Sequence, residues 1–250
     1  MTFLKLFSII SLITFIFTGC NNENDFKNPK DFLSFSQEFL LQQKSGNETE
    51  AFIDTLKNLD NTILIASLNS DEKKIAFWLN CYNALVQYKL SKDSTIYKNK
   101  KAFFTGQSIT IGGEKMSLNT IENNILRLQT AEKNESLIKQ LRPSKLDYRI
   151  HFALNCGANS CPPIAFYDPN DLEQQLTLAE KSFVKSTSIY HSEKNEVEIS
   201  ELFKWYEEDF NGETGIIQLL KQNQIIPIWL NPKITYSHYN WELELNNFSK

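Results

Sequence analysis

One segment limits the possible folds more than any other: residues 71–90 are predicted to form a long helix that is apolar on nearly every side. Asn69-Ser70-Asp71 supplies capping oxygens at its start. Its apolar residues are Ala76, Phe77, Trp78, Leu79, Tyr82, Leu85, Val86 and Leu90. A helix that is hydrophobic all round has to be enclosed by other elements. We therefore expect the rest of the chain to wrap around it.

Three amides form a polar stripe on this predicted helix. Asn80, Asn83 and Gln87 follow one another at positions i, i+3 and i+7, which share a helix face. A buried amide without a partner costs about 1 to 3 kcal/mol, so hydrogen-bond partners are expected. Two alternatives remain open. The stripe is either a buried network that holds a strand or loop, or it includes a pair of substrate-facing amides.

The remaining pattern favours an α+β class: a mainly helical single domain over residues 30–250 with a small, mostly antiparallel sheet. Further helices are predicted over 30–44 and 48–58, from Asn119 with Glu122 as a capping box, from Asp168 to about 185, from Ser200, and over 214–222. Extended segments are predicted around the Gly112-Gly113 hairpin and over 147–155, 187–199, 225–230 and 234–241.

Residues 147–155 give the clearest strand pattern. Apolar residues alternate with a polar row, which is Asp147, Arg149, His151 and Asn155. This polar face either is exposed or lines a cleft, and His151 is either an ordinary side chain or a catalytic base. The other two histidines, His191 and His238, have no metal-ligand spacing, so no metal site is expected.

The segment from Cys156 to Pro163 places two thiols and a hydroxyl in a turn bounded by glycine and proline. Three alternatives remain open: a Cys156–Cys161 disulfide, a thiolate nucleophile with His151 as its base, or two inert thiols. In an unbroken strand His151 and Cys156 would lie roughly 16 Å apart on opposite faces. A dyad would therefore need a bend, which could bring Cys161 or Ser160 toward His151 instead.

The N-terminus predicts export and lipid anchoring. Lys5 precedes an apolar run that ends at Thr18-Gly19-Cys20, and this run is shorter than the roughly 20 residues that span a bilayer. We expect residues 1–19 to be a signal peptide, Cys20 to carry lipid, and residues 20–29 to be a flexible tether to the cell envelope. The expected location is the outer membrane, at its periplasmic face, or the cell surface.

Charge and cysteine count limit the expected partners. The net charge of −4 becomes −5 once Lys5 is removed, so nucleic acid is not expected as a partner. With Cys20 lipidated, Cys81, Cys156 and Cys161 remain, and at least one thiol stays unpaired within the chain. Cys81 is predicted to be a buried core thiol. No cofactor fingerprint is present, and no cofactor is expected.

Several motifs resemble the domain of unknown function 547 family over roughly residues 70–245. They are Ala76 to Ala84, Ser117 to Glu122 with Ile125 to Arg127, Arg149 to Gly157 with Ser160 to Pro162, Trp205-Tyr206, Asp209-Phe210, and Tyr236, Tyr239 and Trp241. The resemblance implies an α+β domain of envelope proteins without an established activity. Asn123 and Asn240 stand where this family often has a histidine and an aspartate.

Two functional hypotheses follow. The first is a thiol-dependent hydrolase or acyl-transferase in which Cys156 or Cys161 is the nucleophile and His151 the base. Its binding or orienting groups would be Asn80, Asn83, Glu122, Arg149 and Asn155. The second is a non-catalytic envelope module in which a Cys156–Cys161 disulfide stiffens the loop.

Overall fold

The computed structural model describes residues 29–131 and 135–249. The predicted signal peptide, Cys20 and all of the predicted tether except residue 29 lie outside the described residues, so these expectations stay predictions. Within the described ranges, none of the helices combines the length and apolar character needed to cross a bilayer.

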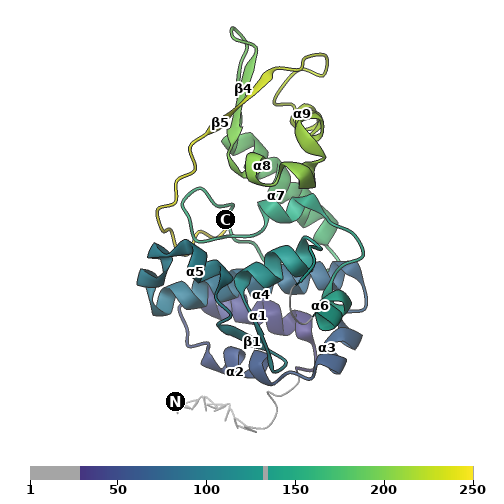
Figure 1. Ribbon diagram of the computed structural model, residues 1–250, viewed down its shortest axis with the longest axis vertical. Coiled ribbons are helices and arrows are strands. Elements are labelled where there is room, and N and C mark those ends of the chain that lie inside the picture. Colours follow the sequence, from purple (N-terminus) through teal and green to yellow (C-terminus); the bar gives the residue numbers. More distant parts are fainter. Residues whose placement is uncertain (1–28, 132–134, 250) are drawn as a thin grey trace, which may run out of the picture.

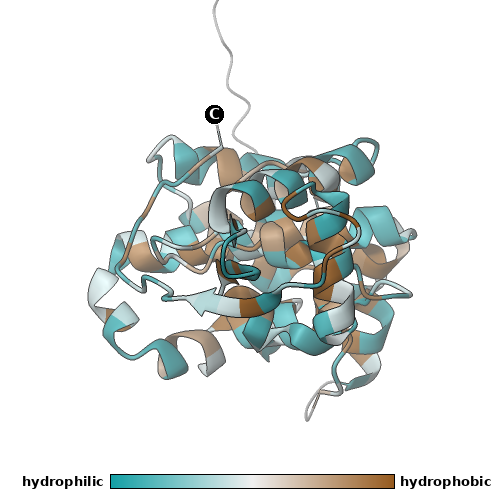
Figure 2. Ribbon diagram, turned by 90° about the horizontal axis from the view of Figure 1, so that it is seen from above, coloured by the Kyte–Doolittle hydropathy of each residue, from teal (hydrophilic) through white to brown (hydrophobic). Residues whose placement is uncertain are grey.

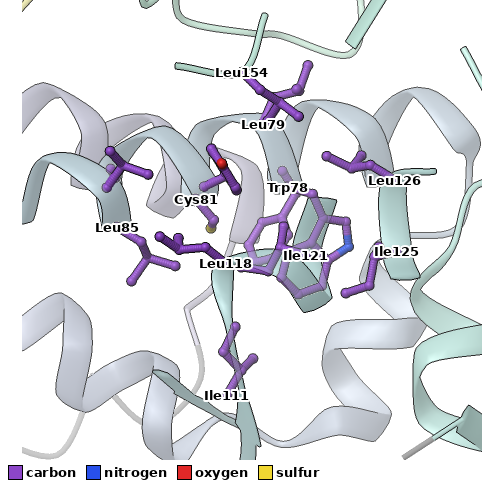
Figure 3. Packing of buried hydrophobic residues seen from close by; sticks show 14 of the residues in the cluster. Trp78, Leu79, Cys81, Leu85, Ile111, Leu118, Ile121, Ile125, Leu126 and Leu154 are labelled. Atoms are coloured by element: carbon purple, nitrogen blue, oxygen red, sulfur yellow. The ribbon is translucent and has the colours of Figure 1, made fainter. Parts of the chain in front are cut away.

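The predicted central helix is confirmed as α4 (Asp71–Lys92), and it packs along α1 (Phe32–Lys44). The Ser70 hydroxyl caps it by accepting the Lys73 N–H at 3.3 Å. Trp78 and Cys81 are fully buried and lie among side chains of neighbouring elements, such as Leu118 and Ile121 (Figure 3).

Shorter elements surround α4 in the part of the molecule drawn lowest in Figure 1. They are α2 (Glu50–Asn58), α3 (Asn61–Ser67), the 3-10 helix η1 (Ser94–Lys98), α5 (Lys100–Thr105), the hairpin of β1 (Ile109–Ile111) and β2 (Glu114–Met116), the π-helix η2 (Thr120–Leu126), and α6 (Glu135–Leu141). Viewed from above, hydrophobic ribbon segments gather toward the middle and hydrophilic ones toward the outside (Figure 2).

A second group of elements forms the upper part of Figure 1. It comprises α7 (Leu172–Thr187), β3 (Ile189–His191), β4 (Glu196–Ser200), α8 (Leu202–Trp205), the 3-10 helix η4 (Glu207–Phe210), α9 (Gly212–Gln222) and β5 (Lys233–Ser237). The sheet order is β3-β4-β5, with β3 antiparallel and β5 parallel to β4. The predicted class, mainly helical α+β with a small and mostly antiparallel sheet, is confirmed.

The strand predicted over 147–155 is wrong: the segment forms a 3-10 helix, η3 (Tyr148–Phe152). The Asp147 carboxylate caps it by accepting the Arg149 N–H at 3.0 Å. Ile150 belongs to the hydrophobic cluster around α4, and Phe152 belongs to a second cluster beneath β4 and α9. The alternating apolar residues therefore wedge between two cores instead of covering one face of a sheet.

Other boundaries also differ from the predictions. The capping box predicted at Asn119 is wrong. The Thr120 N–H donates to the Ser117 hydroxyl at 3.0 Å, and the Glu122 carboxylate forms its hydrogen bonds with tyrosine hydroxyls. Residues 225–230 form turns where an extended segment was predicted. Pro169 lies before α7, outside its first turn. Helices α3, η1, α5 and α6 were not predicted.

Beyond β5 the chain returns across the molecule as residues 238–249, which we call the C-terminal strap (Figure 1). Its backbone pairs with the loop that follows η3: the Glu244 N–H donates to the Gly157 carbonyl at 2.8 Å, and the Ile164 N–H donates to the Asn247 carbonyl at 2.7 Å. Trp241 packs against both hydrophobic clusters. The strap thus ties the two groups of elements together.

Candidate functional site

A cleft of about 210 Å³ lies where α4, η2, η3, α8 and the C-terminal strap meet. Six of its fourteen lining residues are Phe, Trp or Tyr, and a few others are polar. The lining residues are Tyr82, Phe104, Asn119, Glu122, Asn123, His151, Leu154, Cys156, Pro162, Leu202, Trp205, Tyr206, Tyr239 and Trp241. Three predicted site residues, Glu122, His151 and Cys156, are therefore brought together in one cleft.

His151 is held in this cleft by a carboxylate and an aromatic ring. Its side chain is only 1% exposed, and its Nε2 lies 2.7 Å from Oδ2 of Asp209. The imidazole stacks on the ring of Tyr206, with 3.9 Å between ring centroids. Nδ1 has no hydrogen-bond partner among the described residues. Because the carboxylate accepts the Nε2 proton, Nδ1 carries the lone pair.

Asp209 is fixed in turn by its own surroundings. Arg127 Nε donates to the same Oδ2 at 2.6 Å. The segment carrying Asp209 lies directly against α9, since a Cβ on Gly215 would come within 1.7 Å of the Phe210 carbonyl oxygen. Only glycine permits that approach. The carboxylate that orients His151 is therefore anchored through both its backbone and its charge.

The electrostatics of the pair favour a neutral imidazole beside an ionised carboxylate. Burial lowers the pKa of His151, and the hydrogen bond to Asp209 only partly offsets it. Burial alone would raise the pKa of Asp209, but hydrogen bonds from His151 and Arg127 outweigh it and bring the pKa to about 2. His151 is thus in the protonation state of a general base at neutral pH.

Glu122 projects into the cleft from the π-helix η2. Its two carboxylate oxygens accept hydroxyl protons from Tyr206 at 2.6 Å and from Tyr82 at 3.0 Å. Burial, followed by the nearby Glu122 charge, raises the pKa of both tyrosines, which stay protonated donors. Single-turn π-helical segments often occur at functional sites because they redirect a side chain. Tyr206 thus links Glu122 to His151 by one hydrogen bond and one ring stack.

The two loop cysteines form a disulfide, Cys156–Cys161. Cys156 lines the cleft, whereas Cys161 is buried beneath it and its Sγ accepts the Tyr239 hydroxyl at 3.2 Å. Gly157 has the left-handed φ of 87° that turns the loop. Of the three alternatives for this loop, the structure has the bridge, so neither sulfur is a free thiol. Cys81 is buried, as predicted, and burial raises its pKa.

Four predicted binding or orienting residues lie outside the lining of the cleft, and three of them hold backbone in place. Asn80 exchanges hydrogen bonds with the backbone of Tyr167, and Asn83 accepts the Asn155 N–H at 2.8 Å and donates to the Ala153 carbonyl at 3.0 Å. The Asn155 side chain donates to the Pro162 carbonyl at 2.8 Å. Arg149 pairs with Asp147 and Glu173. Asn80 and Asn83 of the stripe on α4 therefore position the loop after η3, whereas Gln87, the third amide, accepts the Asn246 N–H of the C-terminal strap at 3.0 Å.

Sequence reasoning missed Arg127, Asp209, Tyr82 and Tyr206 as site residues. Each lies inside one of the motifs quoted from the sequence, and that was the available signal. The two family departures occupy different places: Asn123 lines the cleft and accepts from Arg127, whereas the Asn240 N–H binds the Ser160 hydroxyl outside it. Among the residues that the structure describes, no group of three or more His, Cys, Asp or Glu is placed to hold a metal ion.

Comparison with known protein families finds a match over part of the chain. The model described as "Protein of unknown function, DUF547" matches residues 65–184. This segment includes α4, Glu122, His151 and both bridged cysteines, whereas Asp209 and the strap lie beyond it. No curated protein and no solved structure matches the chain.

Proposed function

From its DUF547 domain and the geometry of the cleft, we propose that this protein is a lipid-anchored envelope hydrolase or acyl-transferase with His151 as general base. The observation that carries the proposal is the Asp209–His151 hydrogen bond of 2.7 Å, which leaves Nδ1 without a protein partner in a cleft of ligand size. A base oriented by a carboxylate recurs on unrelated folds that perform acyl transfer.

The proposed step uses groups already in place. Nδ1 of His151 takes a proton from the nucleophile, whose oxygen or sulfur forms the new bond to the acyl carbon. The resulting imidazolium is stabilised by the Asp209 carboxylate and returns the proton to the leaving group as the acyl bond breaks. Glu122 and its two tyrosines would orient the substrate.

The state of the bridge decides which nucleophile is available. While Cys156 and Cys161 are bonded to each other, the proposed nucleophile is a water molecule in the cleft. The thiol-dependent form of the hypothesis requires prior reduction, which would give Cys156 a thiol within the same lining. Replacing both cysteines by serine separates the two forms, because only the thiol-dependent reaction is lost.

A non-catalytic module is the second candidate, and the disulfide is the observation that favours it. Asn80, Asn83 and Asn155 brace backbone around a loop that the bridge also stiffens. In that case the cleft binds a ligand without transforming it.

The test is hydrolysis of a panel of activated esters and amides by the full mature protein, with and without reductant. We expect turnover that falls at least about a hundredfold in His151→Gln, because general-base catalysis contributes roughly 10²- to 10⁴-fold. His238→Gln, on an exposed histidine, is the matched control and should keep full activity. Equal rates for the wild type and His151→Gln would reject the catalytic proposal in favour of the binding module.

The lipid anchor needs a separate test. We expect the full-length chain, produced in bacteria, to incorporate labelled fatty acid and to sediment with membranes, and Cys20→Ser to do neither. Unchanged sedimentation and labelling of Cys20→Ser would rule out the anchor at this position.

A further inference from the structure

We propose that the ligand of the cleft carries a cationic nitrogen, an alkylammonium group held between Glu122 and the aromatic cluster of Trp205, Tyr239 and Trp241. The inference deepens the proposed function by naming the substrate class of the same site. It requires that this cleft be the ligand site, but it does not require catalysis.

The charges around the cleft favour a cation. Among its lining residues, all of which the structure describes, Glu122 is the one Asp, Glu, Lys or Arg. Burial lowers the pKa of His151 and keeps it neutral, and the disulfide removes any thiolate. The guanidinium of Arg127 donates its hydrogen bonds to Asp209 and Asn123. An anionic ligand would meet a carboxylate with no lining cation to compensate.

Glu122 can accept more hydrogen bonds than it makes. Each of its oxygens takes one tyrosine hydroxyl, whereas a carboxylate has about four acceptor positions. Those two hydroxyls hold the carboxylate in one orientation before a ligand arrives. An ammonium group, which is a donor with no acceptor, matches the positions that remain.

The aromatic cluster supplies the second half of the recognition. Trp205 lies 4.8 Å from Tyr239 and 5.5 Å from Trp241 between ring centroids, and Tyr239 lies 4.9 Å from Trp241. Ring faces attract cations, and aromatic cages are a known means of binding ammonium groups. After burial and the nearby Tyr97, the Glu122 carboxylate contributes to the raised pKa of Tyr239, so this ring of the cluster lies within range of its charge.

Two cationic side chains of the protein already lie over aromatic rings of this site. The Lys100 ammonium lies 5.6 Å from the Trp241 ring centroid, and the Arg127 guanidinium carbon lies 4.7 Å from that of Tyr206. These contacts leave Trp205, which is 43% exposed, as the ring most open to a ligand.

The test compares two cationic probes with a neutral probe that has the shape of one of them, choline, using the full mature protein. Choline and propylamine are titrated separately against 3,3-dimethylbutan-1-ol, the uncharged analogue of choline. Binding is followed through the indole N–H signals of Trp205 and Trp241 and by calorimetry. We expect at least one cation to shift both indoles and to bind about tenfold more tightly than the alcohol, in line with a cation–π and ion-pair contribution. Comparison of choline with propylamine shows whether the site prefers a quaternary or a primary ammonium.

Variants assign the binding to the two halves of the site. Glu122→Gln keeps a carbonyl oxygen for one tyrosine and should weaken cation binding about tenfold, whereas Glu114→Gln, on the exposed β2 strand, should leave it unchanged. Trp205→Leu is a second variant, for the case that Glu122→Gln fails to fold. It should weaken the binding of the same probe.

Equal affinity for the alcohol and the cations, tighter binding of acetate, or no shift of either indole would overturn the inference. Cation binding without His151-dependent turnover would leave the inference standing and remove the catalytic proposal. Turnover without cation preference would do the reverse.

Discussion

At the scale of single residues, the chemistry of the cleft depends on how Asp209 divides its charge. One oxygen, Oδ2, accepts hydrogen bonds from both the His151 ring and Arg127. The carboxylate therefore neutralises a guanidinium and orients an imidazole at the same time, and its removal should affect both partners.

Asp209→Asn should reduce the free energy of unfolding by about 1 to 3 kcal/mol, because the largely buried Arg127 loses its ionic partner. It should also lower any His151-dependent turnover. Urea denaturation and the ester panel measure the two effects. Asp54→Asn, at an exposed position of α2, should change neither. An Asp209→Asn protein as stable as the wild type would show that the ion pair contributes nothing to the fold.

The pair also predicts how stability depends on pH. In the unfolded chain His151 takes up a proton near pH 6.5, whereas burial lowers its pKa in the folded state. The unfolded state then binds more protons, so the free energy of unfolding should fall as pH drops below 6.5, by at most about 1.4 kcal/mol per pH unit from this group. Asp209 adds a further loss between pH 3.8 and about 2, where only the unfolded carboxyl is protonated.

His151→Gln isolates the histidine contribution. Its unfolding free energy, measured in urea between about pH 7.5 and 5.5, should fall less steeply than that of the wild type, because one proton no longer binds preferentially to the unfolded chain. Parallel curves for the two proteins would contradict a lowered pKa at His151.

At this scale, three of the fourteen residues that line the cleft could be predicted from the sequence as site residues. His151, Glu122 and Cys156 could be predicted because their chemistry is unusual in an apolar setting. Asp209 and Tyr206 could not, because an aspartate and a tyrosine on a short helix are ordinary until the fold places them against the imidazole.

At the scale of elements, a rigid helix positions an irregular one. Asn83 of α4 binds the Ala153 carbonyl and the Asn155 N–H, both just beyond η3. These are the backbone groups that a neighbouring strand would otherwise satisfy. The side chain thus fixes the end of the segment that carries His151.

Asn83→Ala should therefore destabilise the protein strongly. Two buried backbone groups lose their partner, at about 1 to 3 kcal/mol each. Thermal or urea denaturation measures the loss, and Asn58→Ala, on the exposed face of α2, is the control. A cost below 1 kcal/mol would indicate that water or another side chain satisfies these groups.

The contrast between α4 and η3 explains which elements could be predicted. The α4 pattern extends over six turns and is set by the helix itself, so its length and burial follow from the sequence. The alternation over 147–155 is equally regular, but it arises because neighbouring residues enter two different cores. A short period-two run cannot distinguish these environments.

At the scale of the whole molecule, the loop between η3 and α7 and the C-terminal strap close the cleft from one side. Hydrogen bonds from the Asn159 and Glu244 N–H groups join the loop to the strap. The Cys156–Cys161 bridge lies in the same loop. The hydrogen bonds join residues far apart in the chain, so the sequence offered no local sign of them, whereas the bridge spans five residues and was among the alternatives for this loop.

Removing the bridge should loosen this side of the molecule. Closing a loop of about six residues contributes roughly 2 kcal/mol through the unfolded state. The Cys156→Ser/Cys161→Ser variant should lose about that much stability and exchange the Ile164 amide hydrogen faster, because this N–H binds the strap. Denaturation and hydrogen exchange measure the two effects, and Cys81 remains unchanged in both proteins. Identical exchange at Ile164 would mean that the strap is held independently of the bridge.

The proposed role of His151 depends on the protonation of its imidazole. Heteronuclear NMR of the His151 ring nitrogens measures this protonation directly. At neutral pH we expect a neutral ring with its proton on Nε2, a bare Nδ1, and titration below pH 6.5. A proton on Nδ1 or titration at or above pH 6.5 would contradict the assignment of His151 as a general base held by Asp209.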